Sequence, residues 1–537
     1  MSKLARCGFV VGCLALVASA CGSSNGSKSA STAASTTSAS ASASGNVADG
    51  GAGSTPQTTV TGDRDATFRY GFSVTVDSLD PLKNSTASLP LLDPLYDALV
   101  RRNADGTLSP GIATSWDLSA DGSTFTLHLA SGRTFQDGSP LDAAAVKANL
   151  ERAKTLAQSR VAADLSHITG ITATDAQTVV ITVDAEGGRL AAILSDRGGM
   201  MVAPSTFDAD AVDRAPVGSG PFTLTSFDPA KLSYSRWADY YDAASTGLAG
   251  IDVSILPDDA TRSAALQSGQ VDAANLPPAL RGELEGKGLQ AIVLAGTASD
   301  SLVLNTSADH LSDSRVRLAI SHALDRQSIT TAIYQGGCTS STQPYPEGFW
   351  ARNTDTSLDA VGTFDVAQAK QLLADAGVPD GFKMQVVVPN IPQFTTLFEA
   401  LQAALADIGI QAEALVQDTA QFITSITKQE TDAYLGSFDA SRPDVLAFWQ
   451  RMYMPGGTYN PKGYSPDGFE ALFGQAAAAV DTATQGPIIQ QMGGLVLESG
   501  PRCGHRLQLA DADRCGEERS ELQRLLLDPR RHQDRLT

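Results

Sequence analysis

The stretch SLVLNTSADHLSDSRVRLAISHALDR, residues 301–326, carries more structural information than any other part of the chain. It opens with an apolar run of strand-forming residues at 302–304, which Asn305 ends. A short apolar run closed by turn-forming residues is typical of a buried β-strand. We therefore expect a strand that ends beside Asn305.

A helix is predicted directly after this strand. Asp313 or Ser314 can accept hydrogen bonds from the free N–H groups of a first helical turn. The apolar residues that follow at helical spacing are Val316, Ala319, Ile320, Ala323 and Leu324. The polar residues expected mostly on the opposite face are Arg315, Arg317 and His322. A strand that feeds an amphipathic helix is the unit of an α/β domain.

The composition limits the class of protein. The chain has 537 residues, which suggests two to four domains if each takes about 150 residues. Its hydrophobic content of 42% suits globular packing. The net charge of −20 argues against nucleic acid as a partner, because a phosphate backbone needs a basic face.

Cysteine and histidine patterns give little support for a metal, redox or catalytic site. The six cysteines are Cys7, Cys13, Cys21, Cys338, Cys503 and Cys515, with no CxxC pair among them. The six histidines form no HExxH pattern, and no G-x-S-x-G elbow occurs. We expect no metal, no cofactor and no catalytic residues, which leaves a secreted hydrolase as the weaker alternative.

The N-terminal segment has the features of a secretory signal peptide. Lys3 and Arg6 precede an apolar run at 9–17, which is too short to be a membrane span. Small residues then lead to Cys21. Its placement resembles a bacterial lipobox in which Ala18 replaces the usual Leu, and this resemblance implies a lipidated Cys21. The alternative is an ordinary cleavage site and a freely secreted protein.

Residues 22–61 are nearly all Ser, Ala, Thr and Gly. A segment of this composition has no apolar periodicity and cannot bury a core. It behaves as a flexible coil. A tether that follows an anchored cysteine explains the segment well.

The first half of the body is predicted to consist of short strands joined by tight turns. Asp-Gly dipeptides begin at Asp105, Asp121 and Asp137, and such dipeptides are strong turn signals. A helix is predicted after Asp142, which can cap it. The segment PVGSGPF at 216–222 demands a specific backbone turn. A strand rather than a helix follows it, which excludes a phosphate-binding P-loop.

The second half alternates between helices and strands. The pattern predicts a helix at 366–376, a strand at 383–389, a helix at 395–408 and a strand at 410–416. Glycines follow both helices, as expected for helix ends. This alternation predicts a parallel α/β lobe.

Taken in order, these motifs resemble family 5 solute-binding proteins of ABC importers, the dipeptide- and oligopeptide-binding type. The matching motifs are Asn305-Thr306, Asp313-x-Arg315-Val316-Arg317, Asp325-Arg326, LYDALV at 95–100, PGIATSW at 110–116, PVGSGPF at 216–222 and ATRSAALQSGQVD at 260–272. The resemblance covers residues 63–500. It implies an α/β, two-lobed periplasmic-binding-protein fold of type II, similar to cluster C, with an extra domain in the first half.

The expected organisation follows from this resemblance. The segments are a signal peptide and lipobox at 1–21, a tether at 22–61, lobe I at 62–90, 210–300 and 470–500, the extra domain at 91–209, lobe II at 301–469, and an atypical tail at 501–537.

The resemblance also implies the function. A lipid-anchored receptor outside the cytoplasmic membrane closes its lobes around a small solute and delivers it to the permease and ATPase subunits of an ABC importer. Members of the family take peptides, nickel complexes, oligosaccharides and other solutes. A peptide is favoured here, and the small number of histidines weighs mildly against nickel. A binding or sensory lipoprotein without transport is the main alternative.

The residues expected to line the ligand cleft are Asn305, Tyr345, Trp350, Phe438, Asp439 and Arg442. In peptide-binding members an acidic residue of the corresponding Asp-Pro-Asp motif pairs with the α-ammonium group of the ligand. Arg442 takes the place of the first acid, while Asp439 or Asp444 could still serve. An arginine suits a carboxylate or phosphate. Alternatively, Arg442 forms a structural pair with Asp439 or Asp444.

The last segment differs from the rest of the chain. Residues 502–537 hold eight Arg and no Lys, and the apolar strand that the family would return to the first lobe is not recognisable. We interpret this as a frameshift near Pro501; the alternative is an amphipathic helix at 517–527. A clean in-frame sequence of the coding region would remove the frameshift hypothesis.

Replacing Cys21 with serine tests the anchor. We expect Cys21→Ser to release the protein from the membrane fraction, because the acyl chains then have no attachment site. Cys13→Ser, which alters only the leader, should leave the protein with the membranes. Membrane partitioning that survives Cys21→Ser would contradict lipidation at this residue.

Overall fold

The computed structural model describes the body of the protein from Arg64 onward. The described residues are 64–103, 106–207, 211–244, 246–291, 298–334, 338–355, 357, 362–440, 442, 444–498 and 506–511. The expected signal peptide, Cys21 and the tether lie outside the described residues. The chain from Thr58 onward forms one compact unit. In the described part, no helix combines the length and apolar character required to cross a membrane.

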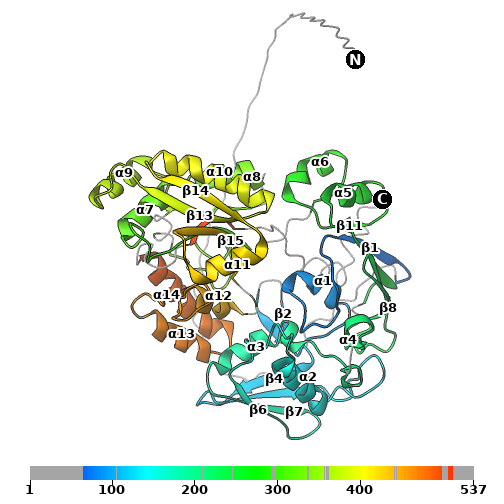
Figure 1. Cartoon of the computed structure of the whole chain (residues 1–537). Coiled ribbons are helices and arrows are strands. Elements are labelled where there is room, and N and C mark those ends of the chain that lie inside the picture. The colour runs from blue at the N-terminus through cyan, green and yellow to red at the C-terminus, as the bar shows by residue number, and fades with distance from the viewer. Residues whose placement is uncertain are drawn as a thin grey trace, which may run out of the picture. The chain divides into compact units, whose positions relative to one another are not determined.

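The lobe I sheet is mixed, with strand order β11-β1-β10-β9-β8. Its strands are β1 (Thr67–Phe72), β8 (Phe222–Asp228), β9 (Lys231–Arg236), β10 (Gly250–Ile255) and β11 (Ala273–Ala274). The first strand is parallel to both of its neighbours, whereas β9 is antiparallel to β8 and to β10. Helices α5 (Asp259–Gln267) and α6 (Arg281–Gly286) belong to this segment of the chain (Figure 1). Gly269 follows α5 with a positive φ of 71°.

The extra domain contains an antiparallel sheet with strand order β4-β5-β7-β6. Its strands are β4 (Ala113–Leu118), β5 (Thr124–Leu129), β6 (Ile168–Ala173) and β7 (Thr178–Val183), with a hairpin of β2 (Val100–Arg102) and β3 (Leu108–Pro110). Helix α2 (Ala143–Thr155) packs on β6 and β7 (Figure 1). Asp142 caps α2 as predicted, because its side chain accepts hydrogen bonds from Ala144 N and Ala145 N. The short helices α1 (Leu89–Leu92), α3 (Leu190–Ile193) and α4 (Ala211–Arg214) lie in the connections.

The lobe II sheet has strand order β14-β13-β15-β12-β16. Its strands are β12 (Ala298–Leu304), β13 (Lys383–Pro389), β14 (Gln411–Gln417), β15 (Ala433–Asp439) and β16 (Arg506–Asp511). Parallel pairing links β13 to β14 and β15, but β12 is antiparallel to β15 and β16. The prediction of a parallel lobe is therefore wrong for β12, whose direction a local pattern of strands and helices does not reveal.

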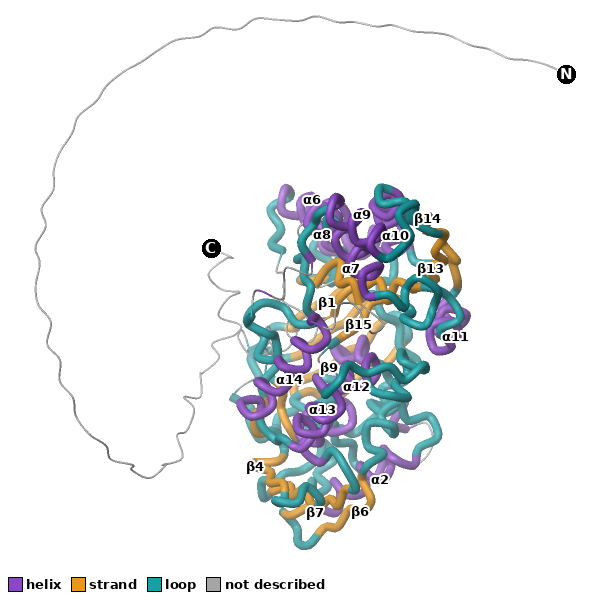
Figure 2. The backbone as a smooth tube through the Cα atoms, turned by 90° about the vertical axis from the view of Figure 1, so that its left-hand side faces the viewer, coloured by secondary structure: helices purple, strands orange, loops and turns teal. Residues whose placement is uncertain are grey.

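Helices cover both faces of this sheet. On one face lie α7 (Ser314–Ala323), α8 (Arg326–Tyr334), α9 (Val366–Asp375) and α10 (Pro392–Ala406), and on the other α12 (Val445–Tyr453), α13 (Phe469–Ala478) and α14 (Thr482–Glu498) (Figure 2). Helix α11 (Thr419–Lys428) packs near β13 and β14. Side chains of β12 alternate between these cores, with Leu302 and Leu304 in the first and Val303 in the second.

The described residues of the segment 470–500, which the sequence places in lobe I by resemblance, share an apolar core with α12 and strands of lobe II. The aromatic ring of Phe469 lies 5.8 Å from that of Trp449 and 5.6 Å from that of Tyr453, centroid to centroid. The apolar face of α13 is thus buried against α12, which fixes α13 to lobe II.

In the tail, residues 506–511 form strand β16, which pairs with β12. The other residues of the tail, 501–505 and 512–537, lie outside the described residues.

Helix α7 follows the predicted strand but not the predicted distribution of charge. Asp313 caps it by accepting from Arg315 N. Arg317 and His322 are buried rather than exposed. The Arg317 Nη1 donates to the carbonyl oxygens of Leu311 and Ser312, and His322 Nδ1 lies 2.6 Å from the carbonyl oxygen of Thr363. Main-chain acceptors thus allow polar side chains to be buried.

The turn at 216–222 holds the strand β8 against the chain that leads into the extra domain. A Cβ atom on Gly218 would lie 1.9 Å from the Leu95 carbonyl oxygen. Ser219 Oγ accepts from Asp97 N and donates to the Met201 carbonyl oxygen, at 3.0 Å in each case. The glycine is required because the two backbones approach too closely for any side chain.

Adding a methyl group at Gly218 tests this contact. We expect Gly218→Ala to lower the free energy of unfolding by at least about 2 kcal/mol, because backbone must move to make room. The matched control is Gly474→Ala in α13, where a Cβ meets nothing within 4 Å, so the change should stabilise the helix by up to about 1 kcal/mol. Urea denaturation measures both, and equal effects would contradict the close approach.

Candidate functional site

A cavity of about 290 Å³ opens among lobe I, the extra domain and lobe II. Lobe I contributes Ser85 and Thr86, the extra domain contributes Arg160, Asp164 and Arg197, and lobe II contributes Ser437, Phe438, Asp439, Arg442, Phe448, Arg451, Met452 and Tyr459. Its size lies near the lower end of the range of about 300–1,000 Å³ that is typical of small-molecule sites. Residues far apart in the sequence therefore enclose a space for a small solute.

The lobe II wall is built from the end of β15 and the first turns of α12. Asp444 caps α12 by accepting from Leu446 N and Ala447 N, which sets the direction of the helix. Phe448, Arg451 and Met452 follow at spacings of three and four, so they share one face. That face is turned to the cavity.

Aromatic rings supply much of the apolar surface of this wall. The Phe438 ring meets the Tyr459 ring edge to face, with 5.3 Å between their centroids. It meets the Tyr434 ring in the same way at 6.2 Å. Edge-to-face pairs of this kind hold aromatic side chains in defined positions. The wall therefore offers a pre-formed apolar surface to a ligand.

On the opposite wall, the extra domain contributes the buried charged side chains of Asp196 and Arg197. Asp196 caps a single 3-10 turn by accepting from Arg197 N at 2.6 Å, and Arg197 Nε lies 3.3 Å from Asp196 Oδ1. The guanidinium of Arg197 also donates to the carbonyl oxygen of Asn84. These contacts fix Arg197 at the edge of the cavity.

Arg442 joins the two walls. Its Nη1 lies 3.2 Å from Asp196 Oδ2 in the extra domain, and its Nε lies 3.4 Å from Asp439 Oδ2 in lobe II. Only 12% of its side chain is exposed. Arg442 is therefore engaged by two carboxylates, of which Asp439, but not Asp196, is expected from the sequence.

A second ion pair between the extra domain and lobe II is buried. Arg189 Nη2 and Nε donate to Asp444 Oδ2 and Oδ1 at 2.9 and 3.2 Å. Arg189 also donates to Glu186 and to Gln450 Oε1. Burial alone would lower the pKa of Arg189, but the carboxylates of Asp444 and Glu186 outweigh burial and raise it. Both carboxylate oxygens of Asp444 therefore bind groups of the protein and serve a structural role.

A third ion pair, more exposed to solvent than the other two, also links the extra domain to lobe II. Arg451 Nη2 lies 3.7 Å from Asp164 Oδ1, and 42% of the Arg451 side chain is exposed. Burial raises the pKa of Asp164 above its ordinary value, and the Arg451 guanidinium opposes that rise. Because this pair is long and solvated, it contributes little to stability.

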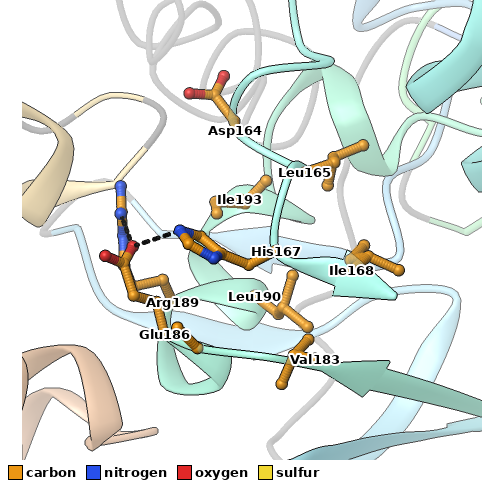
Figure 3. A pocket seen from close by; sticks show the side chains of 10 residues that line it. Asp164, Leu165, His167, Ile168, Val183, Glu186, Arg189, Leu190 and Ile193 are labelled. Atoms are coloured by element: carbon orange, nitrogen blue, oxygen red, sulfur yellow. Dashed lines mark hydrogen bonds and ion pairs between the residues drawn. The ribbon is translucent and has the colours of Figure 1, made fainter. Parts of the chain in front are cut away.

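A smaller hollow of about 10 Å³ lies beside the Arg189 network in the extra domain. Figure 3 shows His167 and Arg189 both directed toward the carboxylate of Glu186. Its volume is close to the minimum that holds one water molecule. This hollow is too small for a solute, so the larger cavity is the candidate site.

Three of the six residues expected in the cleft line the cavity: Phe438, Asp439 and Arg442. The other three lie elsewhere. Asn305 Nδ2 donates to the carbonyl oxygens of Gln429 and Thr431. Tyr345 is buried with its hydroxyl on the Val445 carbonyl oxygen, and Trp350 stacks on Phe349 at 5.7 Å.

Sequence reasoning missed most of the charged lining, namely Arg160, Asp164, Arg197 and Arg451. The amphipathic spacing of α12 was a usable signal for Arg451. No local signal marks the residues of the extra domain, because their position depends on contacts across the chain. Within the described residues, no group of three His, Cys, Asp or Glu side chains is placed to hold a metal ion.

Comparison with known proteins gives a consistent picture. The family model for bacterial extracellular solute-binding proteins, family 5 (middle region), matches residues 107–460. The glutathione-binding protein GsiB of Salmonella paratyphi A is 28% identical over 359 residues, which cover 64% of this chain and 68% of that protein. GsiB of Escherichia coli K12 is 27% identical over 358 residues, with the same coverage of 64% and 68%.

Solved structures share the fold. The binding protein AgaA of A. tumefaciens R10, in complex with agropinic acid, has a TM-score of 0.65 at 26% identity and covers 82% of this chain and 91% of its own. DppA of Helicobacter pylori, in complex with the peptide STSA, has a TM-score of 0.67 at 24% identity and covers 84% and 93%. Both are periplasmic binding proteins, and the described two-lobed α/β arrangement agrees with theirs.

The contribution of the buried pair can be measured by neutralising Asp444. We expect Asp444→Asn to lower the free energy of unfolding by about 3 kcal/mol, because the variant keeps a capping oxygen but leaves Arg189 without its bidentate partner. The control Lys383→Gln breaks a pair whose side chains are 74% and 56% exposed, and should cost less than about 1 kcal/mol. If both variants melt alike, the pair does not stabilise the contact between the extra domain and lobe II.

Proposed function

This chain belongs to family 5 of the bacterial extracellular solute-binding proteins, and on that premise we propose that it captures a peptide or similar small solute in the cavity between its lobes and delivers it to an ABC importer. The observation that carries the proposal is the cavity itself. It is lined by side chains from three separate parts of the chain and combines aromatic rings with charged groups.

Capture requires a change between open and closed arrangements. A ligand shifts such an equilibrium only if it binds one state more tightly than the other. Contacts to Ser85 and Thr86 on one side and to Phe438 and Phe448 on the other would do so, because a solute that touches both walls of the cavity would lose one set of contacts when the lobes part. This differential contact is the physical basis of delivery, because a permease can then distinguish loaded from empty protein.

We further propose that the protein acts outside the cytoplasmic membrane on a lipid anchor at Cys21. The support is the short apolar leader, the small residues before Cys21 and the tether at 22–61. The length and the Ser, Ala, Thr and Gly composition of this segment suit a tether that would let the body reach a membrane-embedded permease while it stays at the surface. The receptor would then meet its permease at a raised effective concentration.

A thermal-shift screen of the chain from Gly22 onward tests solute capture. We expect a small peptide to raise the melting temperature, since a ligand at 100 times its Kd stabilises the folded state by about 2.7 kcal/mol. The panel contains dipeptides, tripeptides, acetylated dipeptides, amino acids, sugars and nickel chelates. Cooperative melting with no shift from any of them would contradict the proposal.

A pair of variants locates the binding. Ser437 lies on the cavity wall, so Ser437→Trp should fill the cavity and abolish the shift. Ser226→Trp places the same side chain at an exposed position of strand β8 and should leave the shift unchanged. A shift that survives Ser437→Trp would place the solute elsewhere.

A further inference from the structure

We propose that the solute carries a carboxylate and no free ammonium group, and that Arg160 holds this carboxylate; the inference rests on the proposed solute capture. The cavity presents four guanidinium groups against two carboxylates. Asp196 lies behind the wall and contacts Arg197 and Arg442, so one positive charge remains in surplus when it is included. The chain as a whole carries a net charge of −20. A positive cavity in so acidic a protein favours an anion.

The carboxylates of the lining already have cationic partners. Asp439 pairs with Arg442 at 3.4 Å, and Asp164 pairs with Arg451 at 3.7 Å. An ammonium group of a solute would have to displace Arg442 to reach Asp439, and it would have to compete with the longer, more exposed Arg451 pair to reach Asp164. Burying an ammonium group without a carboxylate partner is costly. The cavity therefore disfavours a free peptide N-terminus.

The arginines that line the cavity differ in how many of their guanidinium N–H groups already bind acceptors of the protein. Arg197 and Arg442 are held by Asp196, Asp439 and the Asn84 carbonyl oxygen. Arg160 is exposed at the rim, and its guanidinium makes no ion pair or side-chain hydrogen bond with the described residues. Its backbone N–H is fixed on the Leu82 carbonyl oxygen at 2.8 Å, so the side chain starts from a defined position.

Hydroxyl groups beside the cavity add to this subsite. Ser85, Thr86 and Ser437 line it, and within the described part of the chain their hydroxyls make no hydrogen bond. They can donate to a carboxylate or accept from an amide N–H. A planar guanidinium binds a carboxylate through two parallel N–H groups. The aromatic wall of Phe438, Phe448 and Tyr459 then suits the apolar body of the solute, so that an N-blocked dipeptide has the required chemistry.

Calorimetric titration with matched probes tests this assignment. Acetyl-Ala-Phe has the carboxylate and lacks the ammonium, Ala-Phe has both, and acetyl-Ala-Phe-amide has neither. We expect acetyl-Ala-Phe to bind at least about tenfold more tightly than the other two, because one charge-assisted hydrogen bond changes the affinity by about this factor. Phenyl phosphate is the fourth probe; if it binds and acetyl-Ala-Phe does not, the assignment of a carboxylate is wrong.

Variants of Arg160 at the edge of the cavity test whether this residue holds the carboxylate. Arg160→Gln should weaken acetyl-Ala-Phe at least about tenfold while the melting temperature of the free protein stays the same, because the side chain is exposed. Arg160→Lys should recover part of the affinity, since it keeps the charge but loses the bidentate geometry. Arg281→Gln alters an exposed arginine of α6 outside the cavity and should change nothing. Equal affinity of Arg160→Gln and wild type would overturn the role of Arg160.

The outcomes distinguish failure of the proposed solute capture from failure of the proposed preference for a blocked N-terminus. If Ala-Phe binds as tightly as acetyl-Ala-Phe, solute capture stands and the preference for a blocked N-terminus is wrong. If neither these probes nor any member of the wider panel binds, the proposed solute capture fails as well.

Discussion

The ion pair between Arg189 and Asp444 is the constraint on which the arrangement of the site depends. Two residues separated by 255 positions meet in a buried, bidentate contact. Asp444 also begins α12, and Arg189 is oriented from its own domain by Glu186, which adopts a left-handed backbone with φ of 57°. The pair thus sets both the start of α12 and its position against the extra domain. Removing one partner of a buried pair is costly because the other charge is left without compensation, so the contact strongly disfavours other positions of α12.

The charges around the cavity explain how closure and binding are coupled. Arg442 lies between Asp196 of the extra domain and Asp439 of lobe II, so separation of the lobes would break contacts that are partly shielded from water. Hydration of the separated charges offsets part of the attraction that is lost. A solute with contacts on both walls adds to the closed state contacts that the open state lacks, and so shifts the equilibrium between them.

Local features are predictable from the sequence, whereas contacts between distant segments are not. Caps such as Asp142 and Asp313 depend on side chains within three residues of the helix start, and both act as expected. The burial of Arg317 depends on carbonyl groups that a pattern of apolar residues does not reveal. The sequence places 470–500 in lobe I by resemblance, whereas Phe469 at the start of α13 packs on Trp449 of α12, a contact that no local pattern indicates.

The same distinction holds for the candidate site. Phe438, Asp439 and Arg442 are expected near the cleft because they lie at or just beyond a strand end, and they line the cavity. Asn305 also follows a strand, but its amide instead ties the end of β12 to the chain before β15. Arg160 and Arg197 have no sequence signal, since their place at the cavity depends on how the extra domain contacts lobe II.

Small-angle X-ray scattering with and without a bound solute tests the central claim, namely that this protein closes its lobes around its ligand. We expect the solute that raises the melting temperature also to reduce the radius of gyration, and Ser437→Trp to remove this reduction. A solute that binds at the cavity and leaves the scattering curve unchanged would contradict it.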